Sequence, residues 1–271
     1  MRRFRYLALT FVAAVVAALS IPASASSAEP LDYVAMGDSF ASGAGAGDYF
    51  ESNSWKGSGC YQSTNAYAPL WAGQLNAQFD FQACSGATIP DIHSNQLGTI
   101  DSNTDLITLS VGGNDVGFAD VITDCTLWSD STCIDRVNDA EAEAVSRLPG
   151  ELGNLYSTIS QAAPNAEVVI IGYPLLFSDE TCWGSLGISR NEQAHINDAT
   201  YTLKNVTETA ATNAGFTFVD PIDEFAGHGV CTSTSYVNGL SSDLAESYHP
   251  NATGHSDGFI PALNASAPVK H

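Results

Sequence analysis

The strongest constraint on the fold is a series of short apolar segments that alternate with segments of helical periodicity. The clearest apolar segment covers residues 167–172 and is almost uniformly apolar, as expected of a parallel strand that is buried on both faces. The other strand-like segments are 31–36, 79–84, 105–111 and 216–219. Helical spacing is found in 67–78, 135–162, 189–213 and 251–263. This alternation predicts a three-layer α/β/α domain with a mainly parallel sheet of about five strands.

Local signals mark where some of these elements begin and end. Ser189 is followed three residues later by Glu192, a capping box that predicts the start of the long helix. Pro149 and Gly150 should kink or split the helix predicted over 135–162. Residues 125–135 are polar and are predicted to form an excursion closed by a disulfide.

The first 28 residues have the pattern of a secretory signal peptide. Three arginines precede an apolar run over residues 7–19, and small-x-Ala cleavage sites end at Ala25 and Ala28. The apolar run is too short for a stable membrane anchor, so we expect cleavage after one of these two alanines. Residues 29–271 then form a single domain, which we expect to be secreted, extracellular, monomeric and without stable membrane insertion.

The charge of the chain excludes one class of partner. The sequence has 30 acidic and 9 basic residues, which gives a formal net charge of −21. Three of the basic residues lie in the predicted leader, so the mature chain is more acidic still. Such a charge repels nucleic acid and anionic membrane surfaces at long range. We therefore expect no nucleic-acid partner.

The chain has six cysteines, which suggests three disulfides in an exported protein. Six cysteines allow 15 pairings, and the sequence alone does not select one. Cys125 and Cys133 are close enough along the chain to close a small loop. The sequential pairing would be Cys60–Cys84, Cys125–Cys133 and Cys182–Cys231. No Cys-x-x-Cys motif occurs, so no metal site is expected.

Three of the predicted strands end in residues that could carry chemistry. In a parallel α/β sheet, catalytic groups lie at the carboxyl ends of the strands. Ser39 follows the first strand at a turn that could expose its hydroxyl and its N–H, as a nucleophile requires. Asn114 follows two glycines and could donate a hydrogen bond to an oxyanion without adding charge. Taken singly, Ser39 could equally cap a helix and Asn114 could equally form a turn.

One of the six histidines is a candidate general base. His249 precedes Pro250, which favours an extended backbone and could direct the imidazole away from a loop. The alternative is an ordinary histidine in a surface loop. His255, six residues further on, is expected on a helix face.

Together these residues resemble the SGNH (GDSL-like) hydrolase family. The blocks that match, in order, are Gly37-Asp38-Ser39, Gly86, Gly113-Asn114-Asp115 and His249-Pro250. The length, the leader and the cysteine pairs are most similar to the secreted actinobacterial lipase, esterase and phospholipase A1 branch. The resemblance implies a flavodoxin-like sheet and three disulfides. It also implies that Ser39 is the nucleophile and His249 the base, with an oxyanion hole from Ser39, Gly86 and Asn114, and that no metal or organic cofactor is needed.

The sequence departs from the family pattern at two positions. Phe40 replaces the leucine that often follows the serine, and Glu246 replaces the aspartate of the usual Asp-x-x-His. In some relatives a main-chain carbonyl two residues before the histidine orients the ring, which here is that of Ser247. Either group can fix the imidazole tautomer through a hydrogen bond. We favour the Ser247 carbonyl, with the Glu246 carboxylate as the alternative.

The predicted function is that of a secreted serine esterase or lipase that hydrolyses acyl esters of lipids, with phospholipids among the candidate substrates. The aromatic residues near the nucleophile could line an acyl groove or pack in a loop; they are Phe40, Tyr49, Phe50 and Trp55. The enzymatic alternative is an acetyl-carbohydrate esterase. A non-catalytic carbohydrate-binding module would require the loss of a catalytic residue, and none is lost.

Overall fold

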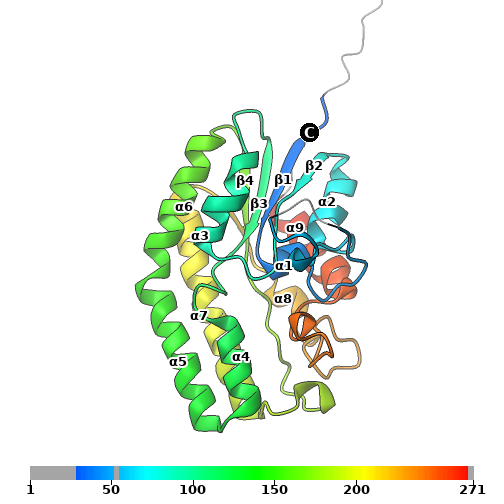
Figure 1. Cartoon of the computed structure of the whole chain (residues 1–271), viewed down its shortest axis with the longest axis vertical. Coiled ribbons are helices and arrows are strands. Elements are labelled where there is room, and N and C mark those ends of the chain that lie inside the picture. Colours follow the sequence, from blue (N-terminus) through cyan, green and yellow to red (C-terminus); the bar gives the residue numbers. More distant parts are fainter. Residues whose placement is uncertain (1–28, 52–54, 268–271) are drawn as a thin grey trace, which may run out of the picture.

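The computed structural model describes residues 29–51 and 55–267, so the predicted signal peptide lies outside the described residues (Figure 1). Five strands form one parallel sheet in the order β2-β1-β3-β4-β5. The strands are β1 (Asp32–Gly37), β2 (Gln78–Phe81), β3 (Leu106–Ser110), β4 (Glu167–Ile171) and β5 (Thr217–Val219). This is the flavodoxin-like strand order.

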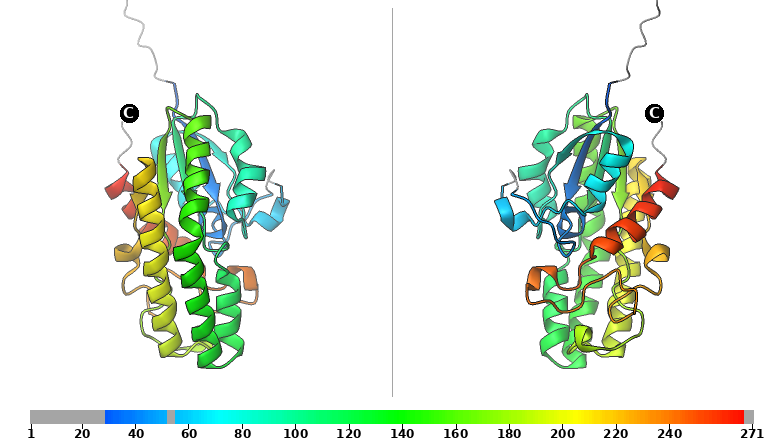
Figure 2. Two further views of the ribbon diagram at one scale, coloured as in Figure 1. Left: turned by 90° about the vertical axis from the view of Figure 1, so that its left-hand side faces the viewer. Right: turned by 90° about the vertical axis from the view of Figure 1, so that its right-hand side faces the viewer.

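Helices cover both faces of the sheet (Figure 2). They are α1 (Ser39–Ser42), α2 (Tyr67–Leu75), α3 (Ile89–Asp91), α4 (Phe118–Leu127), α5 (Asp130–Ser146), α6 (Leu148–Ala162), α7 (Arg190–Ala214), α8 (Ile222–Phe225) and α9 (Ile260–Ser266). Helices α2 and α9 contact each other on one face, and α3, α6 and α7 are in contact on the other. The predicted three-layer α/β/α fold is therefore confirmed.

The middle of the sheet is buried, as its sequence predicts. Every residue of β3 is buried, and so is every residue of β1 beyond its first. In this interior the side chains of the two strands form a 2.8 Å hydrogen bond between the hydroxyls of Tyr33 and Thr108. Each hydroxyl thus provides a hydrogen-bond partner for the other in a region that excludes water.

The region between β3 and β4 confirms the predicted split of the helix over 135–162 and differs from the sequence prediction in the segment before it. The predicted helix over 135–162 is divided into α5 and α6 at Arg147, just before Pro149 in the first turn of α6. The proline fits there because the first helical N–H groups need no intrahelical acceptor. The disulfide predicted to close residues 125–135 is present, but it joins a tight helical hairpin rather than a loop: Cys125 lies in α4 and Cys133 in α5. The Ser129 side chain caps α5 and allows this sharp connection.

The C-terminal helix is less regular than predicted. Residues Gly254–Phe259 form a π-helical segment, and α9 continues from it. Pro261 stands in the first turn of α9, where it lacks the N–H that a continuous helix would use. Across residues 29–51 and 55–267, none of the helices combines the length and apolar character that spanning a membrane requires.

Candidate active site

The turn after β1 presents Ser39 at the carboxyl edge of the sheet. Gly37 has a φ of +137°, and a Cβ there would lie 2.4 Å from the carbonyl oxygen of Ser110, so only glycine fits. The amide side chain of Gln96 accepts from the Gly37 N–H at 2.8 Å and donates to its carbonyl at 2.9 Å. Asp38 then caps α1 by accepting from the Phe40 N–H at 3.0 Å. Ser39 is therefore held at the first position of a short helix.

The structure brings Ser39 and His249 into direct contact. The Ser39 hydroxyl lies 2.7 Å from Nε2 of His249, although 210 residues separate the two along the chain. The other ring nitrogen, Nδ1, lies 2.9 Å from the carbonyl oxygen of Ser247. Because that carbonyl can only accept, Nδ1 carries the proton and Nε2 is free to accept from the serine.

Burial keeps the imidazole neutral. His249 is 8% exposed, and burial lowers its pKa to about 4, while the hydrogen bond to the Ser247 carbonyl opposes this shift. A histidine with such a pKa is uncharged at neutral pH and can accept the serine proton.

The carboxylate of Glu246 points to a different partner. Its Oε1 accepts a 2.8 Å hydrogen bond from the Tyr49 hydroxyl, and its Oε2 lies 3.5 Å from the Ser241 hydroxyl. Of the two groups that the sequence offers for orienting His249, the Ser247 carbonyl is the one in hydrogen-bond contact with the ring.

Gly86 and Asn114 lie on neighbouring turns at the same edge. Gly86 has a φ of +78°, in the region that favours glycine. Its N–H donates no hydrogen bond within the described part of the chain. Nδ2 of Asn114 donates a 3.0 Å hydrogen bond to the carbonyl of Ala87, which joins the two turns. An amide nitrogen carries two hydrogens, so this bond orients Asn114 and leaves its second N–H for another acceptor.

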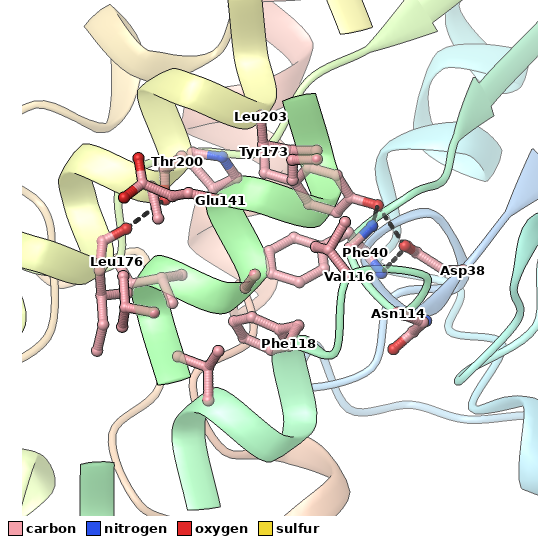
Figure 3. A pocket seen from close by; sticks show the side chains of 18 of the residues that line it. Asp38, Phe40, Asn114, Val116, Phe118, Glu141, Tyr173, Leu176, Thr200 and Leu203 are labelled. Atoms are coloured by element: carbon pink, nitrogen blue, oxygen red, sulfur yellow. Dashed lines mark hydrogen bonds between the residues drawn. The ribbon is translucent and has the colours of Figure 1, made fainter. Parts of the chain in front are cut away.

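Tyr173 connects the turns that carry Ser39 and Asn114, and it is not among the residues that the sequence singles out. It follows β4, and its hydroxyl accepts the Gly113 N–H at 3.0 Å and donates to Oδ2 of Asp38 (Figure 3). Burial raises the pKa of Asp38 to about 7, against the lowering effect of the Tyr173 hydrogen bond. Tyr173 directly follows the strand predicted over 167–172, so the rule that catalytic groups lie at strand ends would also identify it.

An apolar pocket begins at Ser39 and extends among the helices beyond the sheet edge (Figure 3). Its apolar walls come mainly from α4, α5 and α7 and include Phe118, Val121, Val137, Ala140, Ala144, Ile196 and Leu203. Phe40 also lines it, with its ring centroid 5.0 Å from that of Tyr173 and 4.9 Å from that of His249. The other three aromatic candidates, Tyr49, Phe50 and Trp55, do not line this pocket and are exposed.

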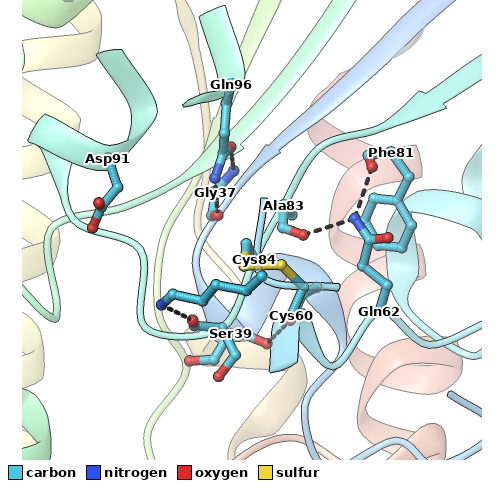
Figure 4. The surroundings of a disulfide bond; sticks show 12 residues. Gly37, Ser39, Cys60, Gln62, Phe81, Ala83, Cys84, Asp91 and Gln96 are labelled. Atoms are coloured by element: carbon cyan, nitrogen blue, oxygen red, sulfur yellow. Dashed lines mark hydrogen bonds between the residues drawn. A yellow bond between two sulfur atoms is a disulfide. The ribbon is translucent and has the colours of Figure 1, made fainter. Parts of the chain in front are cut away.

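Three disulfides are present: Cys60–Cys84, Cys125–Cys133 and Cys182–Cys231. The first lies beside the candidate oxyanion turn (Figure 4). It ties a loop after α1 to the end of the segment that follows β2, and the Ser85 N–H donates to the Cys60 carbonyl at 3.0 Å. This crosslink fixes the backbone immediately before Gly86.

Comparison with known proteins gives a consistent result. Residues 35–256 match the model of the GDSL-like Lipase/Acylhydrolase family. The chain is 44% identical over 275 residues to "Lipase 1" of Streptomyces coelicolor, covering 98% of this chain and 100% of that protein.

Two solved structures share the fold closely. The crystal structure of an extracellular lipase from Streptomyces rimosus superposes with a TM-score of 0.82 at 39% identity, covering 88% of this chain and 100% of that one. That of a phospholipase A1 from Streptomyces albidoflavus NA297 has a TM-score of 0.82 at 41% identity, with the same coverage.

Proposed function

Because this chain belongs to the GDSL-like lipase/acylhydrolase family and is an ester hydrolase, we propose that it cleaves acyl esters of lipids through an acyl-enzyme on Ser39. The observation that carries the assignment of the nucleophile is the 2.7 Å contact between the Ser39 hydroxyl and Nε2 of His249. Serine hydrolases need a nucleophile within hydrogen-bond distance of a base, and a third group that orients the base.

His249 acts first as a base and then as an acid. Its neutral Nε2 accepts the Ser39 proton as the hydroxyl oxygen attacks the ester carbonyl, and the imidazolium then protonates the leaving alcohol. The Ser247 carbonyl holds the Nδ1–H tautomer throughout and stabilises the imidazolium by accepting its hydrogen bond at 2.9 Å. Water, activated by the same imidazole, then hydrolyses the acyl-enzyme.

The oxyanion is stabilised by three hydrogen-bond donors. They are the N–H groups of Ser39 and Gly86 and the second N–H of the Asn114 amide. The Ser39 N–H stands at the start of a helix and has no intrahelical acceptor. The Ala87 carbonyl orients the Asn114 amide before substrate binds. Removing one such donor typically costs about 3–4 kcal/mol of barrier stabilisation.

The apolar pocket beside Ser39 supports a lipid acyl chain as the substrate. Its wall of aliphatic and aromatic side chains offers an acyl chain a site away from water, and the pocket begins at the nucleophile. The relatives named lipase and phospholipase A1 support the same substrate class.

We further propose that residues 29–271 form one secreted, extracellular and monomeric domain after removal of the leader. The sequence pattern of residues 1–28, the three disulfides and the net charge of −21 support export, as does the Streptomyces rimosus relative described as extracellular. The same charge argues against nucleic acid as a partner.

The proposal is tested by hydrolysis of p-nitrophenyl butyrate by Ser39→Ala, with Ser42→Ala as the matched control on the same short helix. We expect Ser39→Ala to lose activity by about 10⁴-fold or more, and Ser42→Ala to keep the wild-type rate within about threefold. Wild-type rates in Ser39→Ala would contradict the proposal.

A chain-length series identifies the acyl group. We expect p-nitrophenyl esters of medium or long acyl chains to give a higher kcat/KM than the acetate, because each added methylene enters the apolar pocket. A preference for the acetate, together with release of acetate from acetylated xylan, would instead indicate the acetyl-carbohydrate esterase.

A further inference from the structure

Lys56 places its ammonium group beside the candidate oxyanion turn. Nζ donates a 3.0 Å hydrogen bond to the carbonyl of Ser85 and lies 4.4 Å from the centroid of the Trp55 ring. A Cβ built on Gly86 would lie 3.4 Å from this nitrogen. The cation is therefore next to the residue whose N–H faces the reacting ester in the proposed mechanism.

The position of Lys56 is set by covalent and main-chain contacts. It directly precedes the 3₁₀ turn Gly57–Cys60, whose last residue forms the disulfide to Cys84. The Cys60 carbonyl also accepts from the Ser85 N–H. The disulfide and this hydrogen bond thus join the loop that carries the lysine to the turn that carries Gly86 (Figure 4).

Lys56 differs in its partners from most of the other basic residues that the structure describes; Arg190, at the start of α7, likewise forms no ion pair among them. Arg136, Arg147 and Lys204 each form ion pairs with carboxylates. Within the described residues, Lys56 makes no ion pair, and both of its contacts are to uncharged groups, a carbonyl and an indole ring. The Lys56 ammonium is thus a local positive charge in a chain with a net charge of −21, and it has no ion-pair partner among the described residues.

The shape of the site indicates which part of a substrate would meet this charge. Lys56 does not line the apolar pocket, which we assign to the acyl chain. The alcohol part of the ester must therefore lie outside that pocket. The histidine side of the site carries the carboxylates of Asp243 and Glu246, which accept hydrogen bonds from Tyr61 and Tyr49, and these repel an anionic group.

We propose that Lys56 binds the phosphodiester of a glycerophospholipid whose acyl ester is cleaved at Ser39. This inference rests on the proposed function. The ammonium offers the two N–H groups that Ser85 does not use to the phosphate oxygens. Lys56 is then a specificity-determining residue, separate from the groups that perform the chemistry.

The test compares Lys56→Met with wild type on two substrates in the same Triton X-100 mixed micelles, dioleoylphosphatidylcholine and dioleoylglycerol. The substrates share their acyl chains and differ in the phosphocholine group. We expect Lys56→Met to lower kcat/KM for phosphatidylcholine roughly 3- to 10-fold and to leave dioleoylglycerol within about twofold. Lys56→Arg should restore most of the phosphatidylcholine activity, and Lys204→Met, which removes a lysine from α7, should change neither rate.

Equal losses on both substrates, or no loss on either, would overturn the inference. So would a wild-type enzyme that cleaves dioleoylglycerol but not phosphatidylcholine, and in that case the proposed esterase function would stand. Failure of the proposed function itself has a different signature, because Ser39→Ala would then retain activity on p-nitrophenyl butyrate.

Discussion

The two halves of the catalytic pair are held in place by different kinds of groups. Around Ser39, side chains do most of the positioning: Gln96 binds the backbone before the turn, and Tyr173 binds Asp38 within it. Around His249, the main chain does this work. The Ser247 carbonyl binds the ring, and the Asn238 N–H donates to the carbonyl of His249 at 2.9 Å.

This contrast has a consequence for mutagenesis. Where side chains position a catalytic group, substitutions around it should lower the rate even when they do not touch the substrate. Where the main chain positions it, substitution of neighbouring side chains should have little effect, since the carbonyl and N–H groups remain.

In the histidine loop, the His249 side chain itself should be indispensable. We expect His249→Gln to lower kcat on p-nitrophenyl butyrate by about 10⁴-fold or more, because no other group accepts the Ser39 proton. His195→Gln, on the exposed side of α7, is the control and should retain the wild-type rate. A residual activity of His249→Gln above a few per cent would show that another group acts as the base.

In the nucleophile turn, Tyr173→Phe should lower kcat about tenfold, because it leaves the Gly113 N–H without its acceptor and Oδ2 of Asp38 without its donor. Tyr156→Phe is the matched control, since Tyr156 is also buried but its hydroxyl has no hydrogen-bond partner among the residues that the structure describes. The measurement is kcat and KM for p-nitrophenyl butyrate, together with Tm for both variants. A loss of Tm without a loss of kcat would mean that Tyr173 only stabilises the fold.

The two regions should also titrate separately. The proposed mechanism requires neutral His249, whose lowered pKa is about 4, so the loss of kcat/KM that comes from protonating His249 should lie near pH 4 rather than near 6.5. Asp38 has a pKa raised to about 7, and its ionised form is the better acceptor for Tyr173, so kcat/KM should rise a few-fold as pH rises through 7.

Asp38→Asn should abolish the change near pH 7 and leave the limb near pH 4 in place. The profile is measured with p-nitrophenyl butyrate, and circular dichroism at each pH verifies that the protein is folded. A single acid limb near pH 6.5 in the wild type would show that burial does not lower the pKa of His249.

The smallest effect is expected for Glu246→Gln. The carboxylate binds Tyr49 rather than the imidazole, so kcat/KM for p-nitrophenyl butyrate should stay within about threefold of wild type. A fall of several orders of magnitude would show that Glu246 orients His249 during the reaction and that the dyad is a triad.

The same contrast explains what could be predicted from the sequence. The five strands and the three-layer architecture follow from apolar runs and helical spacing, both of which are local patterns. Ser39 and Asn114 stand directly after such strands, so the rule that catalytic groups lie at strand ends identifies them as candidates.

Other parts of the site leave no local signal. Every residue has a carbonyl, so that of Ser247 becomes a candidate only through the family resemblance. The bond between Tyr173 and Asp38 depends on the β1-β3-β4 strand order, which brings residues 135 positions apart into contact. The apolar pocket depends on how α4, α5 and α7 pack, and the sequence patterns do not predict α4, whose end falls in the segment predicted as a polar excursion.

The central claim, that Ser39 is a nucleophile activated by His249, is tested most directly by covalent trapping. The wild-type protein is treated with an alkyl fluorophosphonate, which phosphonylates activated serines, and is then digested and analysed by mass spectrometry. We predict one adduct per chain, on the peptide that contains Ser39, and a strongly reduced rate of labelling in His249→Gln. An adduct on a different serine, or labelling of Ser39 at an unchanged rate in His249→Gln, would contradict the claim.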